Sequence, residues 1–408
     1  MLDKLIYNLR RLFLTPFKIG LISYYYLDKL KQTNGVAIHT YYLSRELAKL
    51  GCEVHVFTKG DKNVIKNYYI GKGKIVIHKI NTKIDCPIKD KLVKLRLSYF
   101  MFDNAVVTEV TKENTKEKFN VIHTHGWLTT GAFISKSLNN IKWIHTFHAL
   151  EKNRLKFMSN EEKEYFKVAK WVESTISHAD ALIAVSDYVR AEVIKDYGIK
   201  SEKVFRIYNG VDLEMFKPER SIDEKIILYV GRFSFEKGMD IIPSIAKIVL
   251  NKNKEAKFTI LAPGRVLPSM QRTEKEYKSL KEKYGDRITL IRDSISREEL
   301  VKIYNKCSIY IQPSRYDSCP TTLLEAMACS KAVIGSNRGG IPEMISNSGI
   351  VVPLGSRIFA LQILRLLKDF RLRERYARRA FDRSKLFNWE NIGQETLNLY
   401  KKISLKNK

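Results

Sequence analysis

Short apolar segments rich in isoleucine and valine alternate along this chain with longer segments in which apolar residues recur at helical spacing. This alternation is typical of βαβ units around a parallel sheet. In the first half, residues 18–23 are predicted to form a strand, residues 37–50 a helix that ends at Gly51, and residues 52–58 the next strand. Further strands are predicted at the segments "KIVIHKI", "VIHTH", "WIHTF" and "ALIAVS".

The same alternation restarts with the predicted strand "IILYVGR" and continues as far as "GIVVP". We therefore predict an α/β protein with two doubly wound, Rossmann-like domains. The predicted parts are an N-terminal domain (1–208, with a basic amphipathic extension at 1–17), a C-terminal domain (209–384), and a C-terminal helix that crosses back to the first domain (385–408).

Composition and charge narrow the class of protein. The chain has 408 residues, 44% of them hydrophobic, which is enough for two sizeable cores. Lys and Arg number 72 against 44 Asp and Glu, and the net charge of +28 predicts attraction to nucleic acid, an acidic membrane or phosphorylated ligands. Five cysteines without CxxC spacing indicate neither a disulfide framework nor a zinc site. This cysteine usage fits a cytoplasmic protein best. No apolar segment reaches the roughly 20 residues that span a bilayer, so we expect no membrane-spanning helix.

The first candidate ligand-binding loop in the second half is "GRFSFEKG", which follows a predicted strand. In open α/β sheets, ligands bind beyond the carboxyl ends of the strands. Gly231 permits a close turn there, and Arg232 and Lys237 supply two cations that suit a diphosphate. A basic surface loop is the alternative interpretation.

A second candidate loop is "DSCPTTLLE", where a helix is predicted to begin. The free N–H groups around Thr321 and Thr322 can bind an anion or sugar hydroxyls. Glu325, one turn further along, can accept two hydrogen bonds from a vicinal diol such as ribose. Asp317 can bind hydroxyls of the same ligand, or it can simply cap the helix.

Glycines after predicted strands permit close approach of a ligand to the backbone. Gly339 and Gly340 lie in one such loop, Gly264 follows the segment "FTILAP", and Gly35 follows the first strand of the chain. The geometry of a tight turn would explain a single glycine equally well.

Four of the eight histidines lie in "HTHG" and "HTFH", at the ends of predicted strands: His123, His125, His145 and His148. Alternate residues of a strand point to opposite faces, and no cysteine or carboxylate completes a zinc-binding set. We therefore expect no metal site. His148, just beyond its strand, is a candidate hydrogen-bond donor to a sugar.

With these motifs in order, the chain resembles the retaining nucleotide-sugar glycosyltransferases of glycosyltransferase family 4, which have the GT-B fold of two Rossmann-like domains facing a central cleft. The resemblance covers residues 18–404. It rests on five segments: "GRFSFEKG", "DSCPTTLLE", the hinge "YNGVD", the glycine loop "NRGGIPEMI" and the crossover helix "FNWENIGQETLNLY". This sequence departs from the family by having Asp317 where glutamate is usual, Cys319-Pro320 for Phe-Gly, and Asn34-Gly35 for Gly-Gly.

The resemblance implies transfer of a sugar from a UDP- or GDP-linked donor to a hydroxyl acceptor, with retention at the anomeric carbon. It implies that Arg232 and Lys237 bind the donor diphosphate and that Glu325 binds the ribose. The expected catalytic residues are Arg232, Lys237, His148 and Asp317. No cofactor or metal ion is expected, because the two cations can stabilise the leaving diphosphate.

Two basic, apolar segments, residues 1–17 and 88–104, favour a peripheral enzyme on the inner face of the cell membrane. The acceptor would then be lipid-linked or a precursor of a cell-surface glycan. Helices packed on their own domain, and a soluble acceptor as in glucan or sugar-phosphate synthases, remain open alternatives. A nucleic-acid-binding protein is supported by the charge alone, since no nucleic-acid-binding motif is present.

Overall fold

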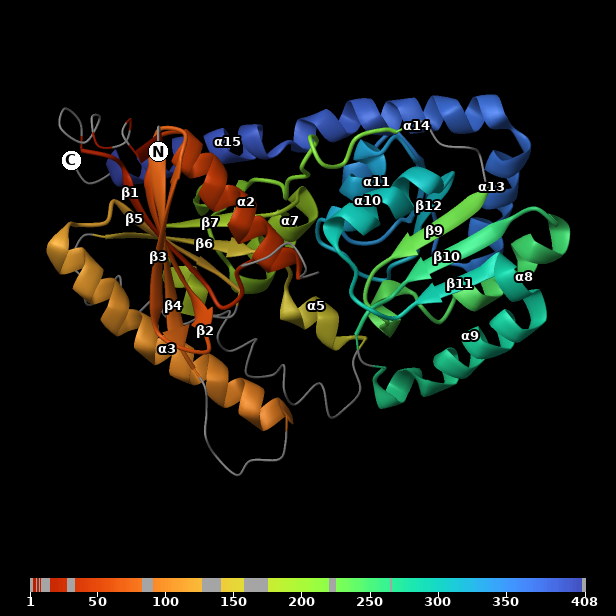
Figure 1. Cartoon of the computed structure of the whole chain (residues 1–408), viewed down its shortest axis with the longest axis horizontal. Helices are drawn as coiled ribbons and strands as arrows, with labels where there is room; N and C mark the ends of the chain where they lie inside the picture. Colours follow the sequence, from red (N-terminus) through yellow and green to blue (C-terminus); the bar gives the residue numbers. More distant parts are fainter. Residues whose placement is uncertain are drawn as a thin grey trace.

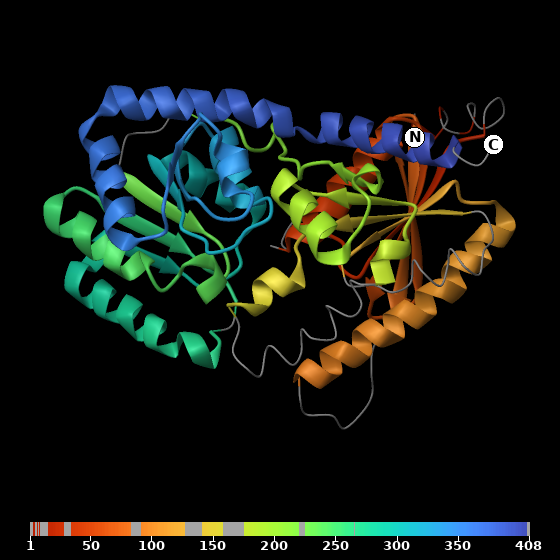
Figure 2. The same ribbon diagram turned by 180° about the vertical axis from the view of Figure 1, so that it is seen from behind.

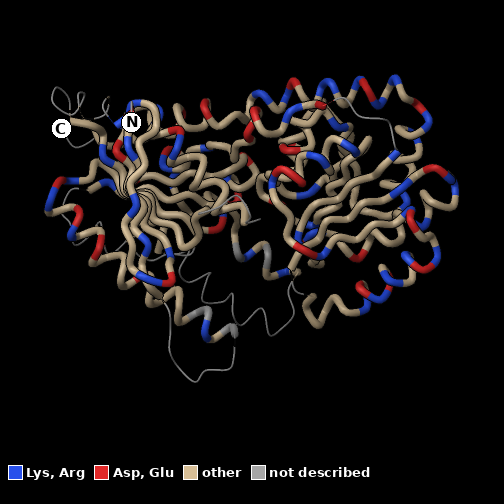
Figure 3. Tube along the Cα trace, in the orientation of Figure 1, with Lys and Arg blue, Asp and Glu red and all other residues tan. Residues whose placement is uncertain are grey.

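The structure is a computed structural model with two α/β domains side by side (Figure 1). It describes residues 3, 4, 6, 8, 15–27, 34–82, 91–126, 141–157, 175–219, 225–264 and 266–405. The predicted extension at 1–17 therefore lies largely outside the described residues. Lys and Arg are spread over both domains (Figure 3). Among the described helices, none combines the length and the apolar composition needed to cross a lipid bilayer.

The first domain is built on an eight-stranded sheet with the order β3-β4-β2-β1-β5-β6-β7-β8. Every neighbouring pair is parallel except the hairpin of β3 and β4. The sequence did not predict β3, because this edge strand is mostly exposed and lacks an apolar run. The strands are β1 (Lys18–Ser23), β2 (Glu53–Gly60), β3 (Val64–Ile70), β4 (Gly73–Asn81), β5 (Val121–His125), β6 (Lys142–Phe147), β7 (Ala181–Ala184) and β8 (Val204–Arg206).

Helix α2 shows how local chemistry sets an element boundary in this domain. It begins at Gly35, because the side chain of Asn34 accepts hydrogen bonds from the N–H groups of Val36 and Ala37. The sequence had predicted a start two residues later. The helices of the first domain are α2 (Gly35–Lys49), α3 (Lys91–Lys116), α5 (Glu151–Leu155) and α7 (Asp187–Tyr197).

The second domain has a six-stranded parallel sheet with the order β11-β10-β9-β12-β13-β14. This is the strand order of the dinucleotide-binding fold, whose ligand crevice lies where the order reverses, here between β9 and β12. The prediction of two doubly wound α/β domains is therefore confirmed. The strands are β9 (Ile226–Val230), β10 (Lys257–Leu261), β11 (Ile288–Ile291), β12 (Ile309–Gln312), β13 (Ala332–Ser336) and β14 (Ile350–Val352).

The last helix, α15, connects the second domain back to the first (Figure 2). It packs against α2, where a Cβ on Gly393 would lie 2.6 Å from the Cβ of Glu46, so only glycine allows this approach. Its residues Trp389, Ile392 and Tyr400 join the core of the first domain. The helices are α8 (Ile242–Lys252), α9 (Gln271–Tyr284), α10 (Arg297–Lys306), α11 (Thr321–Ala328), α12 (Ile341–Ile345), α13 (Ser356–Lys368), α14 (Phe370–Ser384) and α15 (Trp389–Leu405).

Candidate active site

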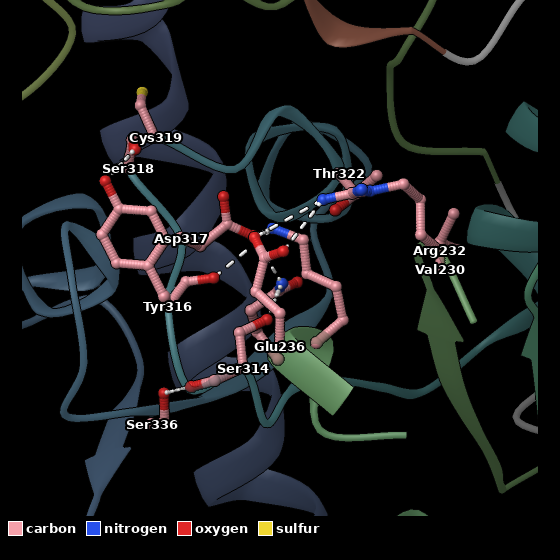
Figure 4. A network of polar contacts seen from close by, with 12 residues as sticks. Val230, Arg232, Glu236, Ser314, Tyr316, Asp317, Ser318, Cys319, Thr322 and Ser336 are labelled. Carbon is pink, nitrogen blue, oxygen red and sulfur yellow. Dashed lines mark hydrogen bonds and ion pairs between the residues drawn. The ribbon is translucent and has the colours of Figure 1, made fainter. Parts of the chain in front are cut away.

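The loops after β9 and β12 meet in one polar network at the switch point of the second sheet (Figure 4). Lys237 Nζ donates to Asp317 Oδ2 at 2.7 Å, and Gln312 Nε2 donates to the same oxygen at 3.2 Å. Arg232 Nη2 donates to Glu236 Oε2 at 3.2 Å. The structure thus brings together three of the four predicted catalytic residues, and it adds Glu236, which the sequence did not single out.

The position of the β9 loop depends on a glycine. Gly238 has a φ of +75°, and a Cβ there would lie 1.9 Å from the carbonyl oxygen of Pro313, which follows β12. Arg315 also fixes the loop, because its guanidinium makes two hydrogen bonds to Asp240 at 2.6 and 2.8 Å. The cations of the β9 loop are therefore held in place by backbone and side-chain contacts from the β12 loop.

The glycines after β13 bring a third loop against this network. A Cβ on Gly339, which has a φ of +58°, would lie 2.2 Å from Asp317 O, and one on Gly340 would lie 2.0 Å from Ser318 O. Both are therefore needed for close approach to the protein's own backbone. A Cβ on Gly231 would similarly lie 2.5 Å from Tyr229 Oη.

The other two predicted glycines have open surroundings. A Cβ on Gly35, at the start of α2, or on Gly264 would meet nothing within 4 Å. The φ of Gly264 is +101°, a backbone conformation that favours glycine irrespective of any ligand. The space beside Gly35 is compatible with the predicted approach of a ligand.

Glu325 lies on α11 with only 3% of its surface exposed, next to a buried cation. Its Oε1 accepts from Arg297 Nη2 and its Oε2 from Tyr304 Oη, both at 3.1 Å. Burial raises the pKa of Glu325, and the charge of Arg297 opposes this shift. Each carboxylate oxygen can accept a second hydrogen bond, so these contacts leave capacity for a diol.

No side chain caps the start of α11, where Thr321 and Thr322 are the first two helical residues. The hydroxyl of Thr322 accepts a hydrogen bond from Tyr310 Oη at 3.0 Å. This helix start lies directly after the loop of Asp317, and its partial positive charge is available to an anion.

In the first domain, His148 lies beside two other histidines, one of which the sequence did not single out. His125 Nδ1 lies 3.1 Å from His148 Nε2, and the ring centroid of His39 lies 4.7 Å from that of His148. Burial lowers the pKa of His39 to about 4 and lowers the pKa of both His125 and His148 well below the usual value. All three imidazoles are therefore neutral at pH 7.

The remaining predicted histidines have partners elsewhere. His123 Nδ1 lies 2.5 Å from Tyr400 Oη, and His145 Nδ1 lies 2.8 Å from Thr124 Oγ1. Both are buried within the first domain, where these contacts hold them in the core.

Two groups among the described residues bring three potential metal ligands within 4.8 Å of one another. The first, His39, His125 and His148, contains no carboxylate. The second, His55, His78 and Glu113, lies near Lys18. Burial lowers the pKa of both histidines and the charge of Lys18 lowers it further, and this cation would also repel a divalent ion. The absence of a metal site stays a prediction.

Hydrogen bonds between the two domains bring the loop of His148 close to the loop that follows β12. Leu150 N, two residues after His148, donates to Tyr316 Oη at 3.1 Å, next to Asp317. Asn209, at the junction of the domains, lies 3.0 Å from His39 Nδ1 of the first domain through its Oδ1, and its Nδ2 donates to Cys319 O at 2.9 Å. The fourth predicted catalytic residue therefore lies at the same interdomain face as the other three.

Comparison with known proteins agrees with this geometry. Residues 33–215 match the family model described as Glycosyltransferase Family 4, and residues 211–383 match Glycosyl transferases group 1. An uncharacterized glycosyltransferase of Methanocaldococcus jannaschii is 28% identical, over 94% of this chain and 98% of its own. A D-inositol 3-phosphate glycosyltransferase of Corynebacterium urealyticum is 25% identical, over 90% and 91%.

Among solved structures, the sucrose-phosphate synthase of Thermosynechococcus elongatus matches with a TM-score of 0.75 and 25% identity, over 95% of this chain and 98% of its own. The fold and the site thus define a glycosyltransferase with the GT-B architecture. The two matched models together span residues 33–383, and the chain is a glycosyltransferase of the family 4 type.

Proposed function

We propose that this enzyme transfers a sugar from a UDP- or GDP-linked donor to a hydroxyl acceptor, with retention at the anomeric carbon. The observation that carries the proposal is the convergence of Lys237, Arg232 and the uncapped start of α11 at the switch point of the second sheet. A largely buried lysine, a more exposed arginine and a helix N-terminus suit the charge of a nucleoside diphosphate.

Retention would proceed by attack from the same face as the leaving group. The bond between the anomeric carbon and the diphosphate oxygen breaks, the acceptor oxygen bonds to that carbon, and the departing diphosphate oxygen takes the acceptor proton. Lys237 and Arg232 stabilise the charge that develops on the diphosphate. This route suits a site in which Asp317 and Glu325 are each held by a cation, so that neither is a free nucleophile.

Glu325 would bind the ribose, and His148 would donate a hydrogen bond to the transferred sugar. Metal independence belongs to the same proposal, because the two cations supply the charge stabilisation that Mg²⁺ gives in other transferases.

The donor is tested by calorimetry of UDP, GDP, ADP and their sugars in the presence of EDTA. We expect selective binding of one nucleotide and its sugar, weakened about tenfold or more by Arg232→Ala because a charge-assisted contact is lost. Arg272→Ala, at an exposed arginine of α9, is the matched control and should bind like wild type. Absence of binding to every nucleotide would contradict the proposal, and binding only with added Mg²⁺ would contradict metal independence.

For the acceptor, we propose a lipid-linked molecule at an anionic membrane surface. Helix α3 supports this with three exposed apolar residues, Val93 (40% exposed), Phe100 (65%) and Met101 (50%), in a protein of net charge +28. A soluble phosphorylated sugar is the second candidate, favoured by the names of the two relatives that act on inositol phosphate or form sucrose phosphate.

Co-sedimentation with vesicles separates these two acceptor classes. We expect the enzyme to bind anionic vesicles at low salt and to bind them several-fold less after joint Phe100→Ser and Met101→Ser substitution, since the apolar contact is lost. The control is Leu361→Ser, which removes a similarly exposed apolar residue from α13. Equal partitioning of wild type and the double variant would favour the soluble acceptor.

A further inference from the structure

The orientation of His148 depends on neighbouring imidazoles that cannot themselves reach a substrate. His148 is half-buried, just beyond β6, whereas His125 on the adjacent strand β5 is 1% exposed. The 3.1 Å contact joins His125 Nδ1 to His148 Nε2. This leaves Nδ1 as the only nitrogen of His148 that can contact a ligand.

A second buried histidine fixes the same ring from another side. His39 packs edge-on against His148, with 78° between the ring planes. Its own Nδ1 lies 3.0 Å from Asn209 Oδ1, and an amide oxygen only accepts, so the proton of His39 is on Nδ1. Asn209 is fixed in turn by its hydrogen bond to Cys319 O. His39 therefore limits the tilt of the His148 ring by packing, and no hydrogen bond joins these two described side chains.

Each neutral imidazole carries one N–H, so the hydrogen bond between His125 and His148 can form in only two ways. If His148 Nε2 carries it, Nε2 donates to His125 Nδ1, and Nδ1 of His148 can only accept from a ligand. If His125 Nδ1 donates instead, Nε2 of His148 accepts and Nδ1 presents an N–H to the ligand. The direction of one buried hydrogen bond thus decides whether His148 is a donor or an acceptor.

The far nitrogen of His125 distinguishes the two arrangements. His125 Nε2 is buried and has no hydrogen-bond partner among the described residues. In the first arrangement it would carry an orphaned N–H, and in the second it would carry only an unused lone pair. Buried N–H groups without an acceptor are the rarer of the two in folded proteins. The second arrangement is therefore favoured.

We propose that His125 is a positioning residue that holds the proton of His148 on Nδ1 and so makes His148 a hydrogen-bond donor to the transferred sugar. This inference rests on the proposed function, in which His148 contacts that sugar. It assigns to His125, the second histidine of "HTHG", a role beyond packing in the core.

The proton positions are measured by 15N NMR of the full-length protein labelled at histidine, with the His148 signals assigned from His148→Gln. We expect the proton on Nδ1 in wild type. The variant His125→Leu removes the N–H that donates to His148 Nε2. In this variant we expect His148 to carry its proton on Nε2, or to show a mixture of the two forms. His125→Asn, whose amide can restore a donor, should return the proton to Nδ1.

Kinetics give the second measurement. His125→Leu should lower kcat/KM about tenfold, the value of one hydrogen bond to the transferred sugar, while the Kd for the free nucleotide stays unchanged. His125→Asn should recover most of this loss. The control is His145→Leu. His145 is as buried as His125, but it contacts Thr124 and not His148. This variant should leave the His148 signals unchanged.

A His148 proton on Nε2 in wild type, or His148 signals identical in wild type and His125→Leu, would overturn the proposal. The NMR measurement needs no substrate. An Nδ1–H signal in a protein that processes no nucleotide sugar would therefore contradict the proposed function and leave the role of His125 in fixing the proton intact.

Discussion

Lys237→Met should lower kcat by about 100- to 1000-fold, the usual effect of removing one preorganised group that stabilises a developing oxyanion. Lys237 Nζ lies 2.7 Å from Asp317 Oδ2, and only 14% of its side chain is exposed, so no solvent cation replaces it. Methionine keeps the length of the side chain and removes the charge. The Kd for the free nucleotide should change far less than kcat, because the leaving-group charge develops only in the transition state.

Steady-state kinetics with the selected donor checks this result. The control is Lys247→Met, at an exposed lysine of α8 outside the network, which should keep the wild-type kcat. The double variant Lys237→Met with Asp317→Asn tests whether an uncompensated Asp317 contributes to the loss. A kcat within threefold of wild type for Lys237→Met would remove this lysine from the mechanism.

Glu325→Ala should destabilise the fold by about 3 to 5 kcal/mol, the usual cost of breaking a buried ion pair by removing one partner. Arg297 would keep its charge in the core, where its guanidinium lies 4.8 Å from the ring centroid of Phe216 and 6.0 Å from that of Tyr42. Urea unfolding measures the change. The same variant should lose selective nucleotide binding, because the ribose would lose its carboxylate.

A pair replacement separates the two effects of Glu325. Substituting both residues, Arg297→Met with Glu325→Leu, should recover most of the lost stability, since apolar side chains of similar volume often replace a buried ion pair without cost. It should not recover nucleotide binding. If the stable double variant binds the nucleotide as wild type does, Glu325 is a structural residue and not a ribose ligand.

The fold was predictable because buried parallel strands have a distinct sequence pattern. Strands such as Ile226–Val230 are apolar on both faces and appear as short isoleucine- and valine-rich segments. The edge strand Val64–Ile70 has exposed residues at most positions, and its pattern resembles that of a loop. The start of α2 was missed because Asn34 determines it through side-chain hydrogen bonds, which apolar periodicity does not report.

The site was predictable as far as strand ends could be located. Arg232 and Asp317 follow neighbouring strands of one sheet, so the rule for open α/β sheets was enough to place their loops together. The pairing of Arg297 with Glu325 was not predictable, because it joins residues on separate helices through packing. Arg297 carries only a weak signal, as the first residue of the helix after β11. Nothing in the sequence marked His39 as a site residue, because its position in a predicted helix indicates only an ordinary core residue.

The contacts of Asp317 explain how an aspartate can serve where glutamate is usual in the family. The aspartate is one methylene shorter than the glutamate usual in the family, yet it reaches both Lys237 and Gln312. The carboxylate of Asp317, in the loop after β12, therefore orients Lys237 of the loop after β9. The shorter side chain is compatible with a role in positioning the cation that the proposed mechanism uses.

Because α15 returns to the first domain, the core of that domain can be completed only after the second domain has been synthesised. Trp389, Ile392 and Tyr400 are synthesised after every strand of the second domain, yet they pack in the same core as residues of β1 and α2. Domains usually fold as they emerge, the N-terminal one first. The apolar face that α15 covers in the first domain therefore stays incomplete until the second domain has been synthesised.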